Sequence, residues 1–229
     1  EGGGGQDELF GHGGDDTLTG GDNGATLIGG SGQDSLDGGT GDDLVEGGSG
    51  NDSLQGGDGR DSLEGGSGDD LLEVAGGDNF LSGDGGDDTL LGGPGNDNAG
   101  GNDGDDLVFG GAGDDTLSGF FGEDLIFGEE GDDVISGWLD DDTLIGGAGD
   151  DSLDGGPRED SLFGSEGDDS LDGSIGFDAI FGEGGRDTLL GNSGNDTLDG
   201  GAGDDRLEAL SGTNVLTGGP GDDLFLLAD

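Results

Sequence analysis

The sequence predicts an all-β solenoid with two parallel sheets of short strands and 18 residues in each coil. Three observations lead to this fold class. A nine-residue unit, G-G-x-G-x-D-x-U-x with U an apolar residue, repeats twenty-five times from residue 2 to residue 226 without insertion or deletion. A short fixed period of this kind is typical of repeat architectures. The 65 glycines, and the absence of a 3.6-residue apolar periodicity, disfavour helices.

The first six positions of each unit predict a turn. The copy at 47–55 reads GGSGNDSLQ, and its glycines can take the left-handed backbone angles that tight turns require. Positions seven to nine predict a strand of three residues. Position eight is apolar in all twenty-five copies, whereas positions seven and nine are mostly polar. Because side chains alternate along a strand, we expect position eight to face inward and its two neighbours to face solvent.

A strand of three residues cannot bury its own apolar side chain, so the repeats are expected to stack. Two repeats form one coil, with a strand and a turn from each. Successive coils then lay strand on strand at a spacing of ~4.8 Å. The predicted core is one row of position-eight side chains from each sheet, and it is thinnest at Ala99.

The net charge of −53 opposes the folding of such a chain into a compact structure. It has 57 Asp and Glu against four Lys and Arg, and only 26% of its residues are apolar. This composition is typical of disordered chains, because self-repulsion is large and the apolar area is small. The regular repeat nevertheless indicates an ordered fold, and such a fold is compatible with this charge if it depends on a cation that cancels it. Nucleic acid and anionic membranes are poor partners, since they would repel the chain. No apolar run is long enough to insert into a membrane as a helix.

The acid at position six is the candidate metal ligand. It is Asp in twenty-two copies and is replaced by Ala25, Asn79 and Asn214 in the others. Stacking would align these carboxylates in two columns, one for each edge of the coil. The first column is Asp7, Asp43, Asp61, Asp97, Asp115, Asp133, Asp151, Asp169, Asp187, Asp205 and Asp223. The second is Asp16, Asp34, Asp52, Asp70, Asp88, Asp106, Asp124, Asp142, Asp160, Asp178 and Asp196.

Carboxylates stacked a few ångströms apart cannot all stay ionised without a counter-charge. Calcium fits this pattern better than magnesium because it accepts six to eight oxygens, backbone carbonyls included, in loose geometry. Zinc and copper favour His or Cys, and the chain has one His and no Cys. An EF-hand would need a twelve-residue loop between helices, and the sequence shows neither. A merely solvated acidic surface does not account for the fixed phase of the aspartates. About twenty calcium ions would offset most of the excess charge.

The unit resembles the calcium-binding nonapeptide of the RTX (repeats-in-toxin) proteins, over residues 2–226. The resemblance implies a right-handed parallel β-roll, with each calcium ion held between successive turns by position-six carboxylates and turn carbonyls. It also implies an extracellular location, with export of the unfolded chain through a type I channel. Some units depart from the pattern: Asp140 and Arg158 replace the position-four glycine, while Val74-Ala75 and Ala209-Leu210 replace the opening Gly-Gly. We expect residues 2–226 to form a single domain and 227–229 to begin a further C-terminal segment.

Apolar side chains at outward positions form a second candidate site. At position nine of the even-numbered repeats they recur every eighteen residues, so they should form a ladder on adjacent strands. Apolar turn residues accompany them on the adjoining edge. The predicted interface residues are Leu91, Phe109, Phe120, Phe121, Leu125, Phe127, Trp138, Ile145, Phe163, Phe177 and Phe181. An exposed apolar patch of this kind marks a contact with another molecule. Cover by another segment of the same chain, or simple cross-strand stacking, would also explain it.

Two functional hypotheses follow. The first is an extracellular structural, adhesin or assembly module that folds on binding calcium and associates with itself or with another extracellular protein through the apolar face. The second is the calcium-folding tail of a secreted enzyme or toxin. We expect no enzymatic activity in this segment, because its single histidine, His12, cannot form a catalytic set with a nucleophile and an orienting residue.

Overall fold

The computed structural model describes residues 1–227 as strands joined by tight turns. The chain divides into two compact units, Glu1–Thr116 and a second unit that begins at Leu117. No helix among the described residues is long and apolar enough to cross a membrane. The C-terminal segment expected to begin at 227–229 falls at the limit of this description: Leu227 ends the last strand, and 228–229 lie outside the described residues.

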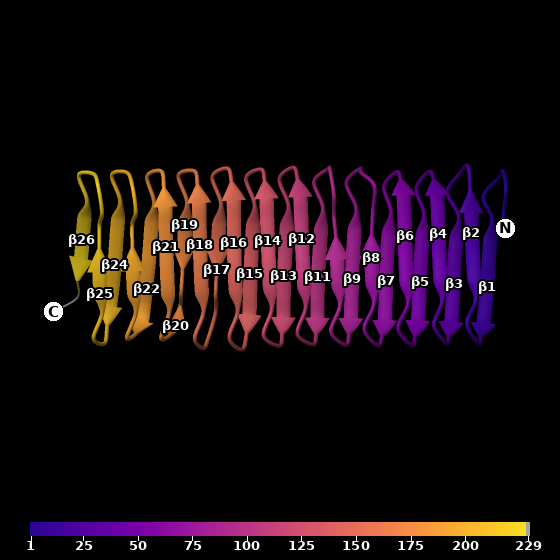
Figure 1. Ribbon diagram of the computed structural model, residues 1–229, viewed down its shortest axis with the longest axis horizontal. Helices are drawn as coiled ribbons and strands as arrows, with labels where there is room; N and C mark the ends of the chain where they lie inside the picture. The colour runs from indigo at the N-terminus through magenta and orange to yellow at the C-terminus, as the bar shows by residue number, and fades with distance from the viewer. Residues whose placement is uncertain (228–229) are drawn as a thin grey trace. The chain divides into compact units, whose positions relative to one another are not determined.

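The first unit contains two parallel sheets, and the chain enters them alternately (Figure 1). One sheet takes the odd-numbered strands β1 (Glu8–Gly13), β3 (Thr26–Ser31), β5 (Leu44–Ser49), β7 (Ser62–Ser67), β9 (Phe80–Gly85) and β11 (Asn98–Asp103). The other takes β2 (Thr17–Gly21), β4 (Ser35–Thr40), β6 (Ser53–Asp58), β8 (Leu71–Glu73), β10 (Thr89–Leu91) and β12 (Leu107–Ala112). Each strand therefore pairs with the strand one coil away and not with its neighbour in sequence.

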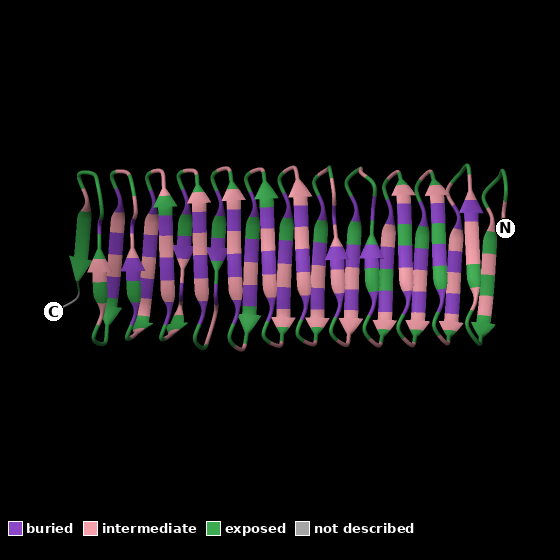
Figure 2. Ribbon diagram, viewed as in Figure 1, coloured by how far each residue is buried: buried purple, intermediate pink, exposed green. Residues whose placement is uncertain are grey.

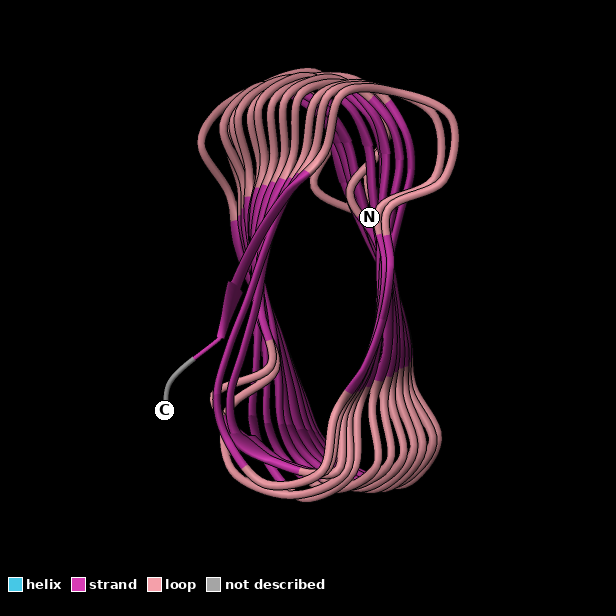
Figure 3. Ribbon diagram, turned by 90° about the vertical axis from the view of Figure 1, so that its left-hand side faces the viewer, coloured by secondary structure: helices cyan, strands magenta, loops and turns pink. Residues whose placement is uncertain are grey.

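The second unit repeats this plan. Its first sheet contains β13 (Thr116–Phe121), β15 (Val134–Leu139), β17 (Ser152–Asp154), β19 (Ser170–Asp172), β22 (Thr188–Gly194), β24 (Arg206–Ser211) and β26 (Leu224–Leu227), with β20 (Ile175–Gly176) paired to β22. Its second sheet contains β14 (Leu125–Glu130), β16 (Thr143–Ala148), β18 (Ser161–Glu166), β21 (Ala179–Gly184), β23 (Thr197–Asp199) and β25 (Val215–Thr217). We call the first the odd-numbered sheet and the second the even-numbered sheet, after the repeats whose position-eight residues they contain. Here too the turns gather at the two edges between the strand layers (Figure 3).

The register confirms the predicted coil of 18 residues. Leu27 pairs with Val45, and Leu144 pairs with Leu162, each partner lying eighteen residues further along the chain. Position-eight side chains are buried from Leu27 to Leu207, as Figure 2 shows by the regular buried bands along the strands. The apolar side chains therefore face inward from both sheets. This confirms an all-β parallel solenoid whose core is one row of side chains from each sheet.

The predicted strand length is wrong for most repeats. Many strands contain six residues. Positions seven to nine of one repeat begin the parallel pairing, and the opening Gly-Gly of the next repeat, with the residue after it, continues that pairing. In β6, for example, Gly57 takes a φ of 98° and still pairs with Gly39 of the preceding coil. Some strands contain only three residues, among them β10 and β17, which Pro94 and Pro157 follow, and β8, β19 and β23, which no proline follows. Glycine here lengthens the strand as well as forming the turn.

Candidate metal sites in the turns

The position-six aspartates line up in two columns, as predicted, and they point into the coil. In the first unit the backbone N–H of Asp34 donates to Oδ1 of Asp52 at 2.7 Å, and Asp52 donates in the same way to Asp70 at 2.7 Å. In the second unit Asp142 donates to Asp160 and Asp151 to Asp169, both at 2.9 Å. Each of these four acceptor carboxylates thus binds the turn of the preceding coil through one oxygen.

These side chains are almost fully buried. Within the described chain, only Asp7, Asp16 and Asp223 of the twenty-two are half-exposed, and each of the others has at most 4% of its surface exposed. Carboxylates are rarely buried to this extent unless they are paired or bind a metal. The columns are therefore built into the interior of each turn and do not form a solvated acidic surface.

The second carboxylate oxygen of these residues accepts no hydrogen bond although it is buried. This holds for Oδ2 of Asp7, Asp16, Asp34, Asp43, Asp52, Asp61, Asp70, Asp88 and Asp97 in the first unit. It holds equally for Asp142, Asp151, Asp160, Asp169, Asp178, Asp187, Asp196 and Asp205 in the second. A buried charged oxygen without a partner is strongly unfavourable, so a row of them indicates a cation ligand. The side chains present fit a hard cation such as calcium.

The position-one glycine makes room for this oxygen. A Cβ on Gly47 would lie 2.6 Å from Oδ2 of Asp52 and 2.6 Å from the carbonyl oxygen of Gly65 in the following coil. Real Cβ atoms do not approach oxygen so closely, and Gly47 has no left-handed φ that would otherwise require glycine. The glycine is therefore required by the space around the carboxylate and carbonyl oxygens.

Burial also changes the acidity of the columns. Desolvation raises the pKa of Asp142 to about 8, and those of Asp88 and Asp178 to about 7. The backbone N–H donated to each carboxylate lowers the pKa, and neighbouring carboxylates raise it further. Without a cation, burial thus shifts Asp88, Asp142 and Asp178 toward the protonated carboxyl, because the charged form lacks compensation.

Asn79 shows where oxygens of two successive turns meet. Its side-chain nitrogen donates to the carbonyl oxygen of Gly77 at 2.8 Å and to Oδ1 of Asp97 at 2.9 Å. Gly77 occupies position four of the same repeat, and Asp97 lies one coil further on. The amide therefore places a positive dipole where a position-four carbonyl and a carboxylate converge.

The two nine-residue repeats with Asn at position six also lack glycine at position one. Val74 is at position one of the repeat of Asn79, and Ala209 is at position one of the repeat of Asn214; both apolar side chains are buried. Elsewhere position one is glycine wherever position six is Asp. The pairing has a steric reason, since the position-one Cβ and the aspartate Oδ2 compete for the same space.

Sequence reasoning missed the structural role of position five. Asp or Asn there accepts a backbone N–H from the following coil, as Oδ1 of Asp132 does from Asp150 at 2.9 Å and Oδ1 of Asp150 from Asp168 at 2.8 Å. These bonds run opposite in direction to those of position six, and they lie at the exposed surface. The frequent acid or amide at position five was visible in the sequence, but the direction of its hydrogen bond was not.

The ligand set cannot consist of side chains alone. Within residues 1–227, no group of three or more His, Cys, Asp or Glu side chains is placed to hold an ion. Backbone carbonyls and water are the other oxygen ligands that calcium accepts in its loose geometry.

A protein-family model, the RTX calcium-binding nonapeptide repeat, matches nearly the whole chain. Its matches cover 1–24, 19–54, 37–72, 46–81, 64–99, 100–135, 118–153, 154–189 and 190–225. The chain belongs to the RTX calcium-binding nonapeptide repeat family. It is thus a calcium-binding β-roll module, a structural fold and not a typical catalytic one. Among curated proteins, no match to this RTX chain is found.

The predicted interface residues fall into two groups in the RTX roll. On the even-numbered sheet, Leu91 pairs with Phe109 in the first unit, and Phe127, Ile145, Phe163 and Phe181 are consecutive partners in the second. Phe163 and Phe181 stack with ring centroids 5.1 Å apart. These side chains are half-buried, as is Leu125 in the strand of Phe127.

The remaining predicted interface residues lie at the ends of odd-numbered strands and in the turns that follow. Phe120 and Phe121 end β13, and Trp138 lies near the end of β15. Phe177 follows β20 and is exposed. The structure therefore places the ladder and most of these turn residues on different strands.

Proposed function

We propose that this RTX chain is an extracellular structural module that folds on binding calcium and assembles through the apolar face of its even-numbered sheet. The observation that carries the first half is the row of buried Oδ2 atoms without hydrogen bonds, of which Asp52 and Asp151 are examples. Calcium supplies, when bound, the positive charge that these oxygens require.

The ligands we assign are the position-six aspartates and carbonyl oxygens of the glycine turns. Position four is the first candidate among the carbonyls, because Gly77 already shares a donor with the carboxylate of Asp97. About twenty ions would bring roughly +40 charges against the net charge of −53. Since the ligands come from different coils, the unfolded chain has no such sites, and occupancy by calcium stabilises the folded state.

The assembly role is supported by the ladder on the second unit. Four consecutive apolar residues, Phe127, Ile145, Phe163 and Phe181, stand on adjacent strands of one sheet face. Soluble proteins rarely leave an ordered apolar strip of this kind uncovered. A second copy of the chain, or another extracellular protein, would bury it.

The test is the molar mass of the calcium-loaded protein, measured by gel filtration with light scattering in millimolar calcium. Discrete oligomers or filaments that dissociate on chelation are expected. A folded protein that stays monomeric at every concentration would refute assembly, and it would favour the alternative in which this chain is the calcium-folding tail of a secreted enzyme or toxin.

A further inference from the structure

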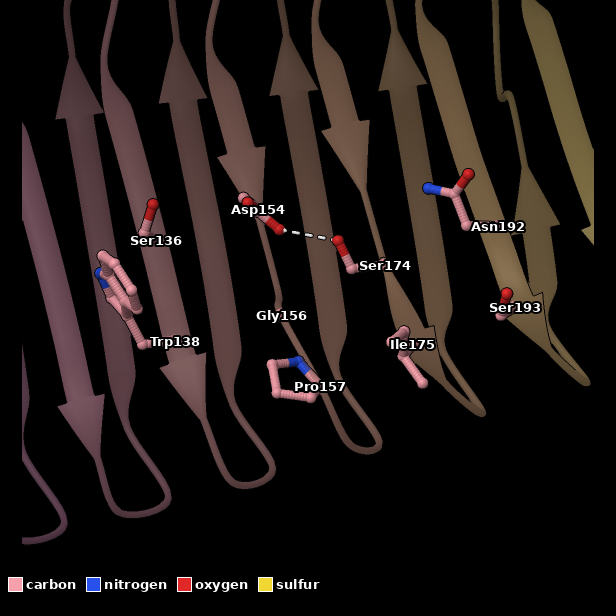
Figure 4. A pocket seen from close by; sticks show the side chains of 9 residues that line it. All are labelled: Ser136, Trp138, Asp154, Gly156, Pro157, Ser174, Ile175, Asn192 and Ser193. Atoms are coloured by element: carbon pink, nitrogen blue, oxygen red, sulfur yellow. Dashed lines mark hydrogen bonds between the residues drawn. The ribbon is translucent and has the colours of Figure 1, made fainter.

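We propose that the outward face of the odd-numbered sheet in the second unit binds a neutral saccharide beside Trp138. An open hollow of about 520 Å³ lies there (Figure 4). Its volume falls within the ~300–1,000 Å³ typical of small-molecule sites. The hollow lies on a different sheet from the apolar ladder, and it contains none of the position-six aspartates. The inference therefore stands apart from both calcium binding and assembly.

The hollow exists because side-chain size changes abruptly along one column of the sheet. Trp138, Gly156 and Ser174 occupy position two of the repeats that begin at residues 137, 155 and 173, and they therefore lie one coil apart on the same edge. A Cβ on Gly156 would collide with the carbonyl oxygen of Trp138, and its φ of 102° also favours glycine. β17 ends at Asp154, and Gly155, Gly156 and Pro157 follow it. The large indole consequently stands beside a coil that has no side chain at the same position.

Trp138 is held in place and its ring remains accessible. The indole stacks on Phe120 with ring centroids 5.6 Å apart and an angle of 13° between the planes. It is nevertheless 53% exposed, and it lines the hollow. Its φ of 77° lies in the left-handed region that aromatic residues rarely adopt. The same conformation recurs at position two of other repeats, as in Phe120 (φ 83°) and Glu129 (φ 78°), so the repeat itself fixes the backbone from which the indole projects.

Polar groups with fixed orientation form the floor of the hollow. Asp154 Oδ1 accepts a hydrogen bond from the Ser174 hydroxyl at 3.1 Å, which Figure 4 shows as a dashed line. Asp172 Oδ1 accepts from the Ser174 backbone N–H at 2.8 Å and from Asn192 Nδ2 at 2.6 Å. Asn192 and Ser174 line the hollow together with Ser136 and Asp154. The floor therefore offers carboxylate, amide and hydroxyl groups beside one flat apolar wall.

This combination matches the chemistry of a pyranose. A pyranose ring has a face of C–H groups that packs on an aromatic ring, and a rim of hydroxyls that donate to carboxylates and accept from amides. Specific sites commonly pair an apolar wall with a few placed polar groups. The net charge of −53 disfavours an anionic sugar. A quaternary ammonium ligand would favour a cage of several aromatic rings, whereas this hollow has one, Trp138.

Intrinsic fluorescence tests the proposal directly, because Trp138 is the only tryptophan in the chain. The calcium-loaded protein is titrated with neutral hexasaccharides of glucose, mannose, galactose, xylose and N-acetylglucosamine, with hexagalacturonate as the anionic counterpart and choline as the quaternary ammonium probe. We expect at least one neutral probe to shift the tryptophan emission saturably, and hexagalacturonate to have no effect. The proposal fails if no neutral probe shifts the emission, or if only choline or hexagalacturonate does.

Variants then locate the binding on the sheet. Binding of the active probe to immobilised protein is expected to fall about tenfold or more in Trp138→Ala, which removes the aromatic face, and to fall in Asp154→Asn, which weakens an acceptor. Phe80→Ala is the matched control, because Phe80 is an exposed aromatic (50%) of an odd-numbered strand in the other unit. A calcium titration followed by circular dichroism confirms that each variant folds. Retained binding by folded Trp138→Ala would overturn the assignment, as would an equal loss in Phe80→Ala.

Discussion

Position-six aspartates such as Asp52 link two coils with one oxygen, and we expect the other oxygen to bind a cation. Oδ1 of Asp52 accepts the backbone N–H of Asp34, while its Oδ2 is buried and accepts no hydrogen bond. The sequence predicted the two columns from the period alone. It could not predict which oxygen is used by the backbone, because that depends on how the turn is oriented against the preceding coil.

The exceptions at position six provide a test at this scale. In Asn79→Asp with Val74→Gly, the carboxylate is restored together with the space that its Oδ2 requires. We expect more calcium ions bound per chain than in the parent protein, and a lower calcium concentration at the midpoint of folding. Calorimetric titration gives the ion count, and circular dichroism gives the midpoint.

Two single variants separate the steric and charge effects. Asn79→Asp alone should lower stability, since it adds a buried charge next to the Val74 side chain. Val74→Gly alone should also destabilise, because it removes a buried side chain whose burial contributes about 1.5–3 kcal/mol. If Asn79→Asp alone gained an ion as readily as the double variant, position-one glycine would have no role in the site.

The raised pKa values predict how the calcium-free chain responds to pH. Burial raises the pKa of Asp142 to about 8 and that of Asp151 to about 7. A carboxyl with a higher pKa in the folded state binds more protons there, so folded-state stability decreases as pH rises from about 4 to about 8. In excess chelator, circular dichroism should therefore show more β structure at pH 5 than at pH 8. A β signal that increased with pH would contradict the burial of these carboxyls.

At the scale of strands, the sequence predicted the inward row and the coil length but not the strand length. The turn glycines were expected to end each strand after three residues, yet β6 continues through Gly56 and Gly57. Left-handed angles are commonly associated with turns, and the pattern does not show that the same angles permit continued pairing with the next coil. The hollow beside Trp138 was likewise not predicted, because it depends on Gly156 lying beside a tryptophan one coil away.

The apolar ladder makes a prediction that also belongs to the strands. Phe127→Ser with Phe163→Ser removes two members of the strip on β14 and β18 while leaving position eight and the turns intact. Calcium-induced folding should persist, whereas the oligomer measured by light scattering should dissociate or weaken about tenfold or more, since two aromatic contacts are lost.

The matched control changes the same strand position on the opposite sheet of the first unit. Glu46 and Glu64 occupy position nine of β5 and β7, and Glu46→Ser with Glu64→Ser should leave assembly unchanged. If both double variants assemble as the parent does, the ladder has no part in association.

At the scale of the whole molecule, folding depends on the balance between a thin core and a large charge. Each coil contributes two position-eight side chains to the interior, whereas the chain as a whole carries a net charge of −53. Because the core is thin and the charge is large, we expect the binding of cations in the turns to be coupled to folding.

Circular dichroism of the chain at pH 7.5, first in excess chelator and then with rising calcium, tests this coupling most directly. We expect a disordered spectrum without calcium and a cooperative gain of β signal as the turns fill, reversed by chelation. A stable β spectrum in excess chelator, unchanged when calcium is added, would contradict it.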